Sequence, residues 1–419
     1  MRRYRTTPKP PKLLNFLNPN FAPFPLFNLM NLHKSLPAAC LLLTLLGGCN
    51  GSGSNVKIEA VDSTEMRALK PPGELPEAEK KRYHDAIESF IQRTGFLRNF
   101  SGGILIAKNG VPVYEHYQGF RDFKTRDSLT AETPLQIAST SKPFTAAAVL
   151  QLVERGKVGL NDSVSRYFPG FPYPVTVRML LNHRSGLPNY LYYMDKDKRW
   201  DRKKLATNED IVNTLLTWNV PRSYRPDVHF SYCNTNYVLL ASIVEKVTGE
   251  KFPAYMKKNF FDRFGMTHTY VKTVNDATFN QSYNRGNAPW ILDFSDGPYG
   301  DKNVYSTPQD LLKWDQAWYQ GLVLGKAMAD SAATPNSNER PSMHNYGLGW
   351  RLLKAPKDKQ VIYHNGHWHG FNSAFARLTH EQGTVIILSN KFNPAVYPFA
   401  RALYNAFGNY DGKQQEGEE

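Results

Sequence analysis

Residues 135–156 read LQIASTSKPFTAAAVLQLVERG, and their pattern predicts a helix from Lys142 to Glu154 that Gly156 ends. Ser139 and Lys142 are three positions apart at the start of this helix, so they lie on neighbouring positions of one face. A serine hydroxyl is a weak nucleophile until a base takes its proton, and a desolvated lysine can be that base. A helix-start serine followed by a solvated lysine is the plainer interpretation, and Ser54 and Lys57 have the same spacing in a linker-like segment.

A second candidate group is Tyr232-Cys233-Asn234, directly before a predicted helix from Asn236 to Val247. A phenol at such a turn could carry a proton between the serine and a leaving group. The Asn234 amide could orient both the lysine and a substrate carbonyl. The alternative is an aromatic packing residue with an asparagine cap, and Tyr363 and Asn365 repeat the same short pattern.

A third group is His364-Asn365-Gly366, followed by His367 at the edge of a predicted hairpin. Glycine lets another part of the backbone approach closely. A substrate laid along this strand would meet unpaired backbone groups, among them the N–H of His367 as an oxyanion donor.

Taken together and in this order, the three groups resemble the serine β-lactamase-like and penicillin-binding hydrolases. The branch is that of class C β-lactamases, D-Ala-D-Ala carboxypeptidases, D-aminopeptidases and esterases. The resemblance extends over about residues 83–407 and includes LLNHRSGLP, VYSTPQDLLKWDQ, YGLGW and HGFNS. It implies the β-lactamase/transpeptidase-like fold, an α+β fold with three α/β/α layers.

The resemblance also implies a role for each matching residue. Ser139 would be the acylated nucleophile, Lys142 and Tyr232 the proton relay, and Asn234 the contact to the substrate amide. His364, Gly366 and His367 would form the substrate-binding third wall. Cys233 occupies the variable middle position of its triplet, so it is expected to be a small packing side chain rather than a second nucleophile.

The third group departs from the family pattern, because it begins with histidine where the class C β-lactamases have lysine. The expected activity is therefore that of a D-Ala-D-Ala carboxypeptidase-like enzyme or a related peptidase or esterase. A β-lactamase and a non-catalytic penicillin-binding sensor are the alternatives. We expect His364 to bind a substrate carboxylate as imidazolium, although its neighbours His367 and His369 disfavour a further positive charge. The alternative is a neutral imidazole that donates a hydrogen bond. No cofactor is expected.

The three histidines His364, His367 and His369 could also form a zinc site, since imidazole is a common zinc ligand. On a strand, however, His367 and His369 share one face and His364 points to the other, and no nearby acid completes the set. No metal site is therefore predicted.

The pattern of elements predicts one antiparallel sheet built from both ends of the chain, covered by helices and interrupted by a helical lobe. The first predicted helix covers Glu77–Thr94, and a hairpin turns at Asn109-Gly110. The lobe is mostly helical between about residues 139 and 319. Near the C-terminus, the strands Phe371–Leu378 and Thr384–Ser389 and a helix over Val396–Phe407 complete the sheet and its cover.

The N-terminal residues resemble a bacterial export signal. The short apolar run 36–46 cannot span a bilayer, and it ends in Leu46-Gly47-Gly48-Cys49, which resembles a lipobox. The predicted segments are a signal peptide (1–48, with Met30 as the true start), a lipidated Cys49 with a linker (49–76), a hydrolase domain (77–410) and a polar tail (411–419). An ordinary signal peptide with an incidental cysteine is the alternative. The protein is thus expected on the outer side of a bacterial membrane, anchored through Cys49.

Composition narrows the function further. The chain has 419 residues with 41% hydrophobic content, enough for a sizeable core. Its formal charge is +14, and the first 48 residues carry six lysines and arginines without an acid. The remaining cations are spread out rather than gathered in a stripe, so a nucleic-acid partner is not expected. The expected partner is instead a small-molecule or peptide substrate.

Overall fold

The computed structural model describes residues 67–411. The predicted signal peptide, the lipobox cysteine Cys49 and most of the predicted linker lie outside the described residues, as do residues 412–419. Among the described residues no helix is long and apolar enough to cross a membrane.

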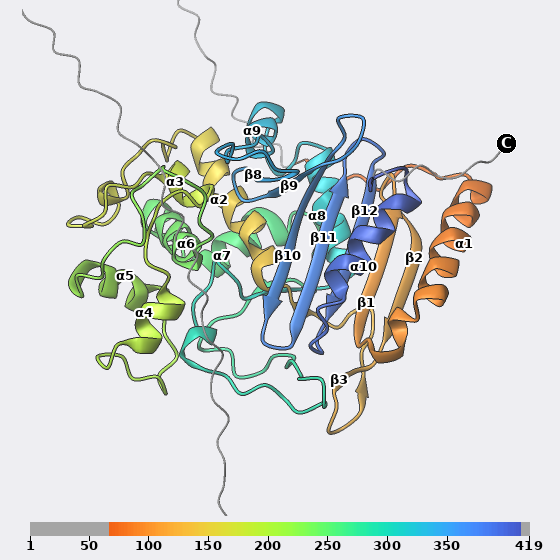
Figure 1. Ribbon diagram of the computed structural model, residues 1–419, viewed down its shortest axis with the longest axis horizontal. Helices are drawn as coiled ribbons and strands as arrows, with labels where there is room; N and C mark the ends of the chain where they lie inside the picture. Colours follow the sequence, from red (N-terminus) through yellow and green to blue (C-terminus); the bar gives the residue numbers. More distant parts are fainter. Residues whose placement is uncertain (1–66, 412–419) are drawn as a thin grey trace, which may run out of the picture. The chain divides into compact units, whose positions relative to one another are not determined.

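A seven-stranded antiparallel sheet is the centre of the structure, with strand order β2-β1-β12-β11-β10-β9-β8 (Figure 1). Its strands are β1 (Gly102–Lys108), β2 (Val111–Gln118), β8 (His344–Tyr346), β9 (Arg351–Lys354), β10 (Gln360–Trp368), β11 (Phe371–Leu378) and β12 (Gly383–Ser389). Strand β1 pairs with β12 from Gly102 opposite Ser389 to Lys108 opposite Gly383. The first and last parts of the chain therefore build one sheet, as predicted.

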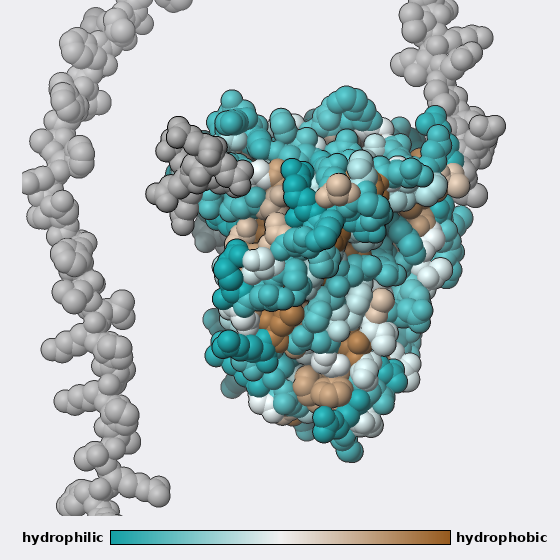
Figure 2. Space-filling view, turned by 90° about the vertical axis from the view of Figure 1, so that its right-hand side faces the viewer, coloured by the Kyte–Doolittle hydropathy of each residue, from teal (hydrophilic) through white to brown (hydrophobic). Residues whose placement is uncertain are grey.

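Helices cover both faces of the sheet. Successive side chains of β1 point to opposite faces, so Ile104 packs with Tyr83 and Phe399 from α1 (Glu77–Thr94) and α10 (Val396–Leu403). On the other face, Leu105 belongs to the larger core that contains Trp314 of α8 (Pro308–Tyr319). The three-layer α/β/α arrangement expected from the family resemblance is thus confirmed. The surface on the α1 side is mostly hydrophilic, with scattered apolar spots (Figure 2).

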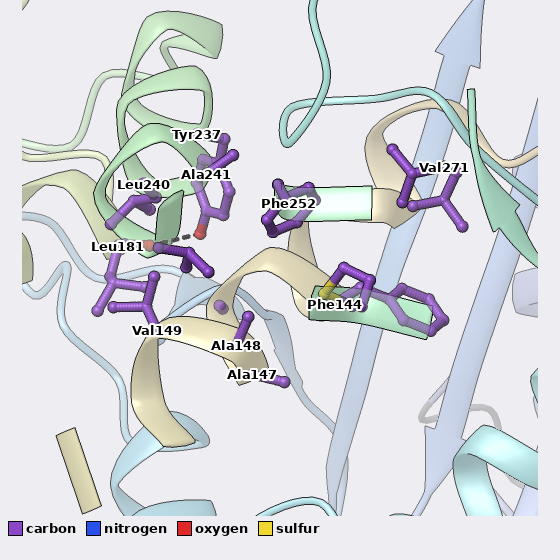
Figure 3. Packing of buried hydrophobic residues seen from close by; sticks show 14 of the residues in the cluster. Phe144, Ala147, Ala148, Val149, Leu181, Tyr237, Leu240, Ala241, Phe252 and Val271 are labelled. Carbon is purple, nitrogen blue, oxygen red and sulfur yellow. Dashed lines mark hydrogen bonds between the residues drawn. The ribbon is translucent and has the colours of Figure 1, made fainter. Parts of the chain in front are cut away.

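The lobe between β2 and β8 is mainly helical, and α3 to α6 lie together to the left of the sheet in Figure 1. It includes the helices α2 (Lys142–Glu154), α3 (Val177–Leu181), α4 (Tyr190–Lys196), α5 (Asn208–Thr217), α6 (Asn234–Thr248) and α7 (Phe252–Met256). Alanines on α2 allow close packing against α6, where Tyr237 and Ala241 lie (Figure 3). The Tyr237 hydroxyl donates to the Leu181 carbonyl at 2.7 Å and so joins α6 to α3.

Smaller elements complete the described chain. They are α9 (Lys326–Ala332), the two-stranded sheet of β3 (Phe120–Asp122) and β4 (Asp127–Ser128), and the three-stranded sheet of β5 (Leu135–Gln136), β7 (Val304–Ser306) and β6 (Tyr270–Val271). In the β5-β7-β6 sheet, β5 leads directly into the segment that carries Ser139.

Several predicted bounds agree with the structure, and others differ by a few residues; β12, for example, begins at Gly383 rather than at Thr384. The helices α1 and α2 and the strand β11 have the predicted limits. Helix α6 begins at Asn234 rather than at Asn236. The predicted closing helix ends at Leu403 and continues as a 3-10 turn over Tyr404–Ala406.

Candidate active site

Ser139 lies in a 3-10 turn, Ala138–Ser141, that runs into α2. The residue before it, Ala138, has a φ of +47°, a left-handed conformation that is unusual for a residue other than glycine. Ser139 is partly exposed, while its neighbours in the turn are buried, and it lines a cavity of about 600 Å³ together with Tyr232 and Asn234. The backbone thus presents one hydroxyl to an open cavity.

Lys142 is fully buried, and its Nζ atom contacts three oxygens: Ser139 Oγ at 3.1 Å, Asn234 Oδ1 at 2.8 Å and the Asp301 carbonyl at 2.8 Å. Burial lowers the pKa of Lys142 to about 7, against the opposing effect of the Asp301 carboxylate and with help from the positive charge of Arg351. A neutral amine has two N–H groups and one lone pair. The amide and carbonyl oxygens can only accept, so they take the two N–H groups and the lone pair faces the Ser139 hydroxyl.

Tyr232 lies over the same lysine, with its ring centroid 4.8 Å from Lys142 Nζ. Its hydroxyl is buried without a hydrogen-bond partner of normal geometry among the described residues. Burial raises the pKa of Tyr232, and Arg351 and Ser139 oppose this rise. The phenol therefore keeps its proton near neutral pH and has a free hydrogen-bonding capacity beside Ser139.

The turn that carries Tyr232 is held by His183, a residue to which the sequence assigned no role. The His183 carbonyl accepts from Ser231 N–H at 2.8 Å, and His183 Nδ1 accepts from Cys233 N–H at 3.1 Å. The His183 ring also packs on Tyr232 with 4.3 Å between centroids. Burial and the nearby Lys142 keep the pKa of His183 well below its usual value, so Nδ1 remains an acceptor. The only signal in the sequence was the segment LLNHRSGLP.

Cys233, between Tyr232 and Asn234, is buried, and its Sγ atom lies 3.5 Å from the Leu187 carbonyl. Burial raises the pKa of its thiol to about 11. A thiol with this pKa stays protonated near neutral pH, which agrees with the prediction of a packing side chain rather than a nucleophile.

The structure contradicts the predicted imidazolium at His364. This side chain is fully buried and is not part of the cavity wall. Its Nδ1 atom lies 2.8 Å from the Asn365 carbonyl, which can only accept, so Nε2 accepts from the Tyr346 hydroxyl at 3.2 Å. Burial, with the charges of Arg351 and Lys142, holds the pKa of His364 well below 6.5. The prediction was wrong because the ring points into the protein.

Gly366 is buried against the Ser139 turn, and His367 lines the cavity. A Cβ atom on Gly366 would lie 2.2 Å from the Ile137 carbonyl and 3.0 Å from Ser139 N, so only glycine allows β10 to lie against the Ser139 turn. His367 is exposed and lines the cavity. Within the described residues β9 pairs with β10 only from Gln360 to Tyr363, so beyond this point β10 has no strand beside it on that edge.

The three histidines considered as zinc ligands do not converge. His364 faces inward, and His369 lies in the turn after β10 rather than on the strand. His369 Nε2 is 3.0 Å from both carboxylate oxygens of Asp296, an acid from a distant segment that the sequence did not place nearby. Asp293, Asp296 and His369 are the only group in the described part of the chain with metal-binding atom types this close together.

Two further residues of the cavity, Asp301 and Lys302, carry opposite charges and were not predicted. Both are buried, and Lys302 Nζ lies 3.2 Å from Asp301 Oδ2. Tyr190 donates to the same oxygen at 3.0 Å and also contacts the lysine. Asp301 Oδ1 is buried without a partner among the described residues.

Comparison with known proteins identifies relatives of this chain. The family described as Beta-lactamase matches residues 88–409. A penicillin-binding protein of Bacillus subtilis is 33% identical over 337 residues, covering 76% of this chain and 74% of the relative. The structure of a penicillin-binding protein from Bacillus halodurans matches with a TM-score of 0.66 at 25% identity, covering 76% of this chain and 98% of that one. A penicillin-binding protein homologue from Pyrococcus abyssi matches with a TM-score of 0.67 at 26% identity and covers 78% of each chain.

Proposed function

The chain belongs to the β-lactamase family of serine hydrolases, and from this premise we propose that Ser139 forms a covalent acyl-enzyme with amide or ester substrates. The observation that carries the proposal is the 3.1 Å contact between Ser139 Oγ and the buried Lys142 Nζ. The pKa of Lys142, about 7, gives this amine a free lone pair at neutral pH.

In the proposed reaction, Ser139 Oγ attacks the substrate carbonyl carbon while its proton passes to Lys142 Nζ. The carbonyl oxygen becomes an oxyanion, which the backbone N–H groups of Ser139 and His367 stabilise. Tyr232 then transfers a proton to the leaving nitrogen or oxygen as its bond to carbon breaks, and Lys142 returns a proton to the phenol. Asn234 holds Lys142 and contacts the substrate amide. Water hydrolyses the ester on Ser139 and releases the acid.

The buried His364 favours substrates without a free carboxylate beside the scissile bond. A D-Ala-D-Ala carboxypeptidase needs to bind the terminal carboxylate of its peptide, and a neutral, inward-facing histidine offers no cation for it. We therefore place amides and esters that lack this carboxylate ahead of D-Ala-D-Ala peptides and β-lactams.

Covalent labelling tests this proposal. A fluorophosphonate probe should label the full-length protein, and Ser139→Ala should abolish the label with little change in melting temperature. Ser54→Ala is the matched control, because Ser54 has the same spacing to a lysine, and its labelling should equal that of the unmodified protein. Full labelling of the Ser139 variant would overturn the assignment.

We also propose that the protein is exported and anchored by a lipid on Cys49. The support is the apolar run 36–46 followed by Gly47-Gly48-Cys49. Cys49→Ala should release the exported protein from washed membranes. Unchanged membrane retention of this variant would exclude lipid anchoring through Cys49.

A further inference from the structure

One wall of the active-site cavity is aromatic. Trp290 and Trp368 form it, both in contact with the His369 ring, and Phe392 and Tyr192 line the same cavity, which also contains Ser139. Two of them are well exposed for aromatic side chains, Tyr192 at 66% and Trp290 at 40%. Ile291 and Leu292, which follow Trp290, are exposed at 86% and 40%. Exposed aromatic residues that line a cavity are typical of a binding surface.

Part of this wall is rigidly held. Trp368 Nε1 donates to Asp296 Oδ1 at 2.7 Å, and His369 Nε2 contacts the same carboxylate at 3.0 Å. Trp290 stacks on the His369 ring, with 5.2 Å between centroids and 22° between planes. Asp296 itself is buried, so one buried carboxylate fixes the base on which Trp290 rests. Aromatic groups held in this way bind apolar ligands with little loss of side-chain entropy.

The charged side chains that line the cavity cancel each other. Its charged residues are Asp301 and Lys302, which pair with each other at 3.2 Å. The Lys302 ammonium also lies 4.4 Å from the Trp368 ring centroid, so the Trp368 ring covers it on that side. A neutral apolar group therefore suits the wall better than an ionised one.

The strand β10 shows which part of a substrate reaches the wall. Gly366, two residues before the end of the strand, lies against the Ser139 turn. At the middle of the strand, the His364 ring is 6.3 Å from the ring of Tyr232, the proposed proton donor to the leaving group. Trp368 is at the end of the strand. A leaving group directed toward Tyr232 places the acyl group toward Trp368 and Trp290.

From this geometry we infer that the Trp290–Trp368 wall is a subsite for a bulky, uncharged aromatic acyl group. The inference rests on the proposed acylation of Ser139 and adds the substrate class to it. Aromatic contacts beyond simple burial correspond to about a two- to tenfold preference for each ring.

Two esters with the same leaving group and different acyl groups test the inference. For the full-length protein, kcat/KM for p-nitrophenyl phenylacetate should exceed that for p-nitrophenyl acetate by at least about tenfold. Trp290→Ala and Tyr192→Ala should each reduce this ratio by about three- to tenfold. Tyr224→Ala is the control, since Tyr224 is 46% exposed but does not line the cavity, and it should leave the ratio unchanged.

The outcomes separate this inference from the proposed function. Hydrolysis of both esters with equal kcat/KM, or a preference that survives both cavity variants, would overturn the aromatic subsite and leave the acyl-enzyme intact. Failure to hydrolyse either ester, together with absence of fluorophosphonate labelling, would overturn both.

Discussion

Two buried lysines, Lys142 and Lys302, lie near the same cavity in different surroundings. Lys142 contacts a hydroxyl, an amide oxygen and a backbone carbonyl, all of them uncharged. Lys302 contacts the Asp301 carboxylate and the Tyr190 hydroxyl. Burial lowers the pKa of both lysines, but for Lys302 two carboxylates, Asp301 and Asp296, oppose it, one of them in direct contact. The difference teaches that burial acts on both lysines, whereas only Lys302 has a carboxylate in direct contact that opposes its effect on the pKa.

Lys142→Met should have the largest effect on activity. It removes the proposed proton acceptor, and kcat/KM for p-nitrophenyl acetate should fall by about 10²- to 10⁴-fold. The melting temperature should change little, because relief from burying an amine offsets the loss of its three hydrogen bonds. An activity loss below tenfold would place the base elsewhere.

Lys302→Met should mainly affect stability. It leaves the buried Asp301 carboxylate without its cation, which costs about 3–5 kcal/mol of the free energy of unfolding. Urea unfolding measures this loss. Adding Asp301→Asn to the same chain should recover most of it, since no uncompensated charge then remains. If the double variant were as unstable as the sum of the two single variants, Lys302 and Asp301 would not act as an ion pair.

Arg351→Gln should have a smaller effect, confined to the pH profile. The Arg351 guanidinium lies 5.2 Å from the Tyr232 ring and lowers the pKa of Lys142. Its removal raises that pKa, so the rise in activity should move to a pH above about 7. Asp301→Asn should move it the other way, because the carboxylate raises the pKa of Lys142. Shifts in the same direction would contradict the electrostatic account.

Much of the fold follows from local patterns in the sequence. Helix α1 has helical apolar spacing and ends at Gly95, and the β11 strand precedes a turn at Gln382, which has a positive φ. Such elements are specified by neighbouring residues. Strands β8 and β9 were not predicted, because segments as short as Arg351–Lys354 have too few residues to show a period.

The site was predictable where a motif and its local turn coincide. Ser139, Lys142, Tyr232 and Asn234 come together as expected, although the last two are about 90 positions from the first. The direction of His364 was not predictable, because it depends on Tyr346 from another strand. Asp301 and Lys302 gave no signal either, since adjacent opposite charges are typical of a solvated turn.

The pH dependence of acylation tests the central claim, that a neutral Lys142 activates Ser139, most directly. The burst rate of p-nitrophenol release from p-nitrophenyl acetate by the full-length protein should be measured by stopped flow between about pH 5 and pH 9. Lys142 accepts a proton only when neutral, so the rate should rise with pH and level off above a midpoint of about 7. A rate that is flat across this range, or that still climbs at its upper end, would contradict a base with the pKa of Lys142.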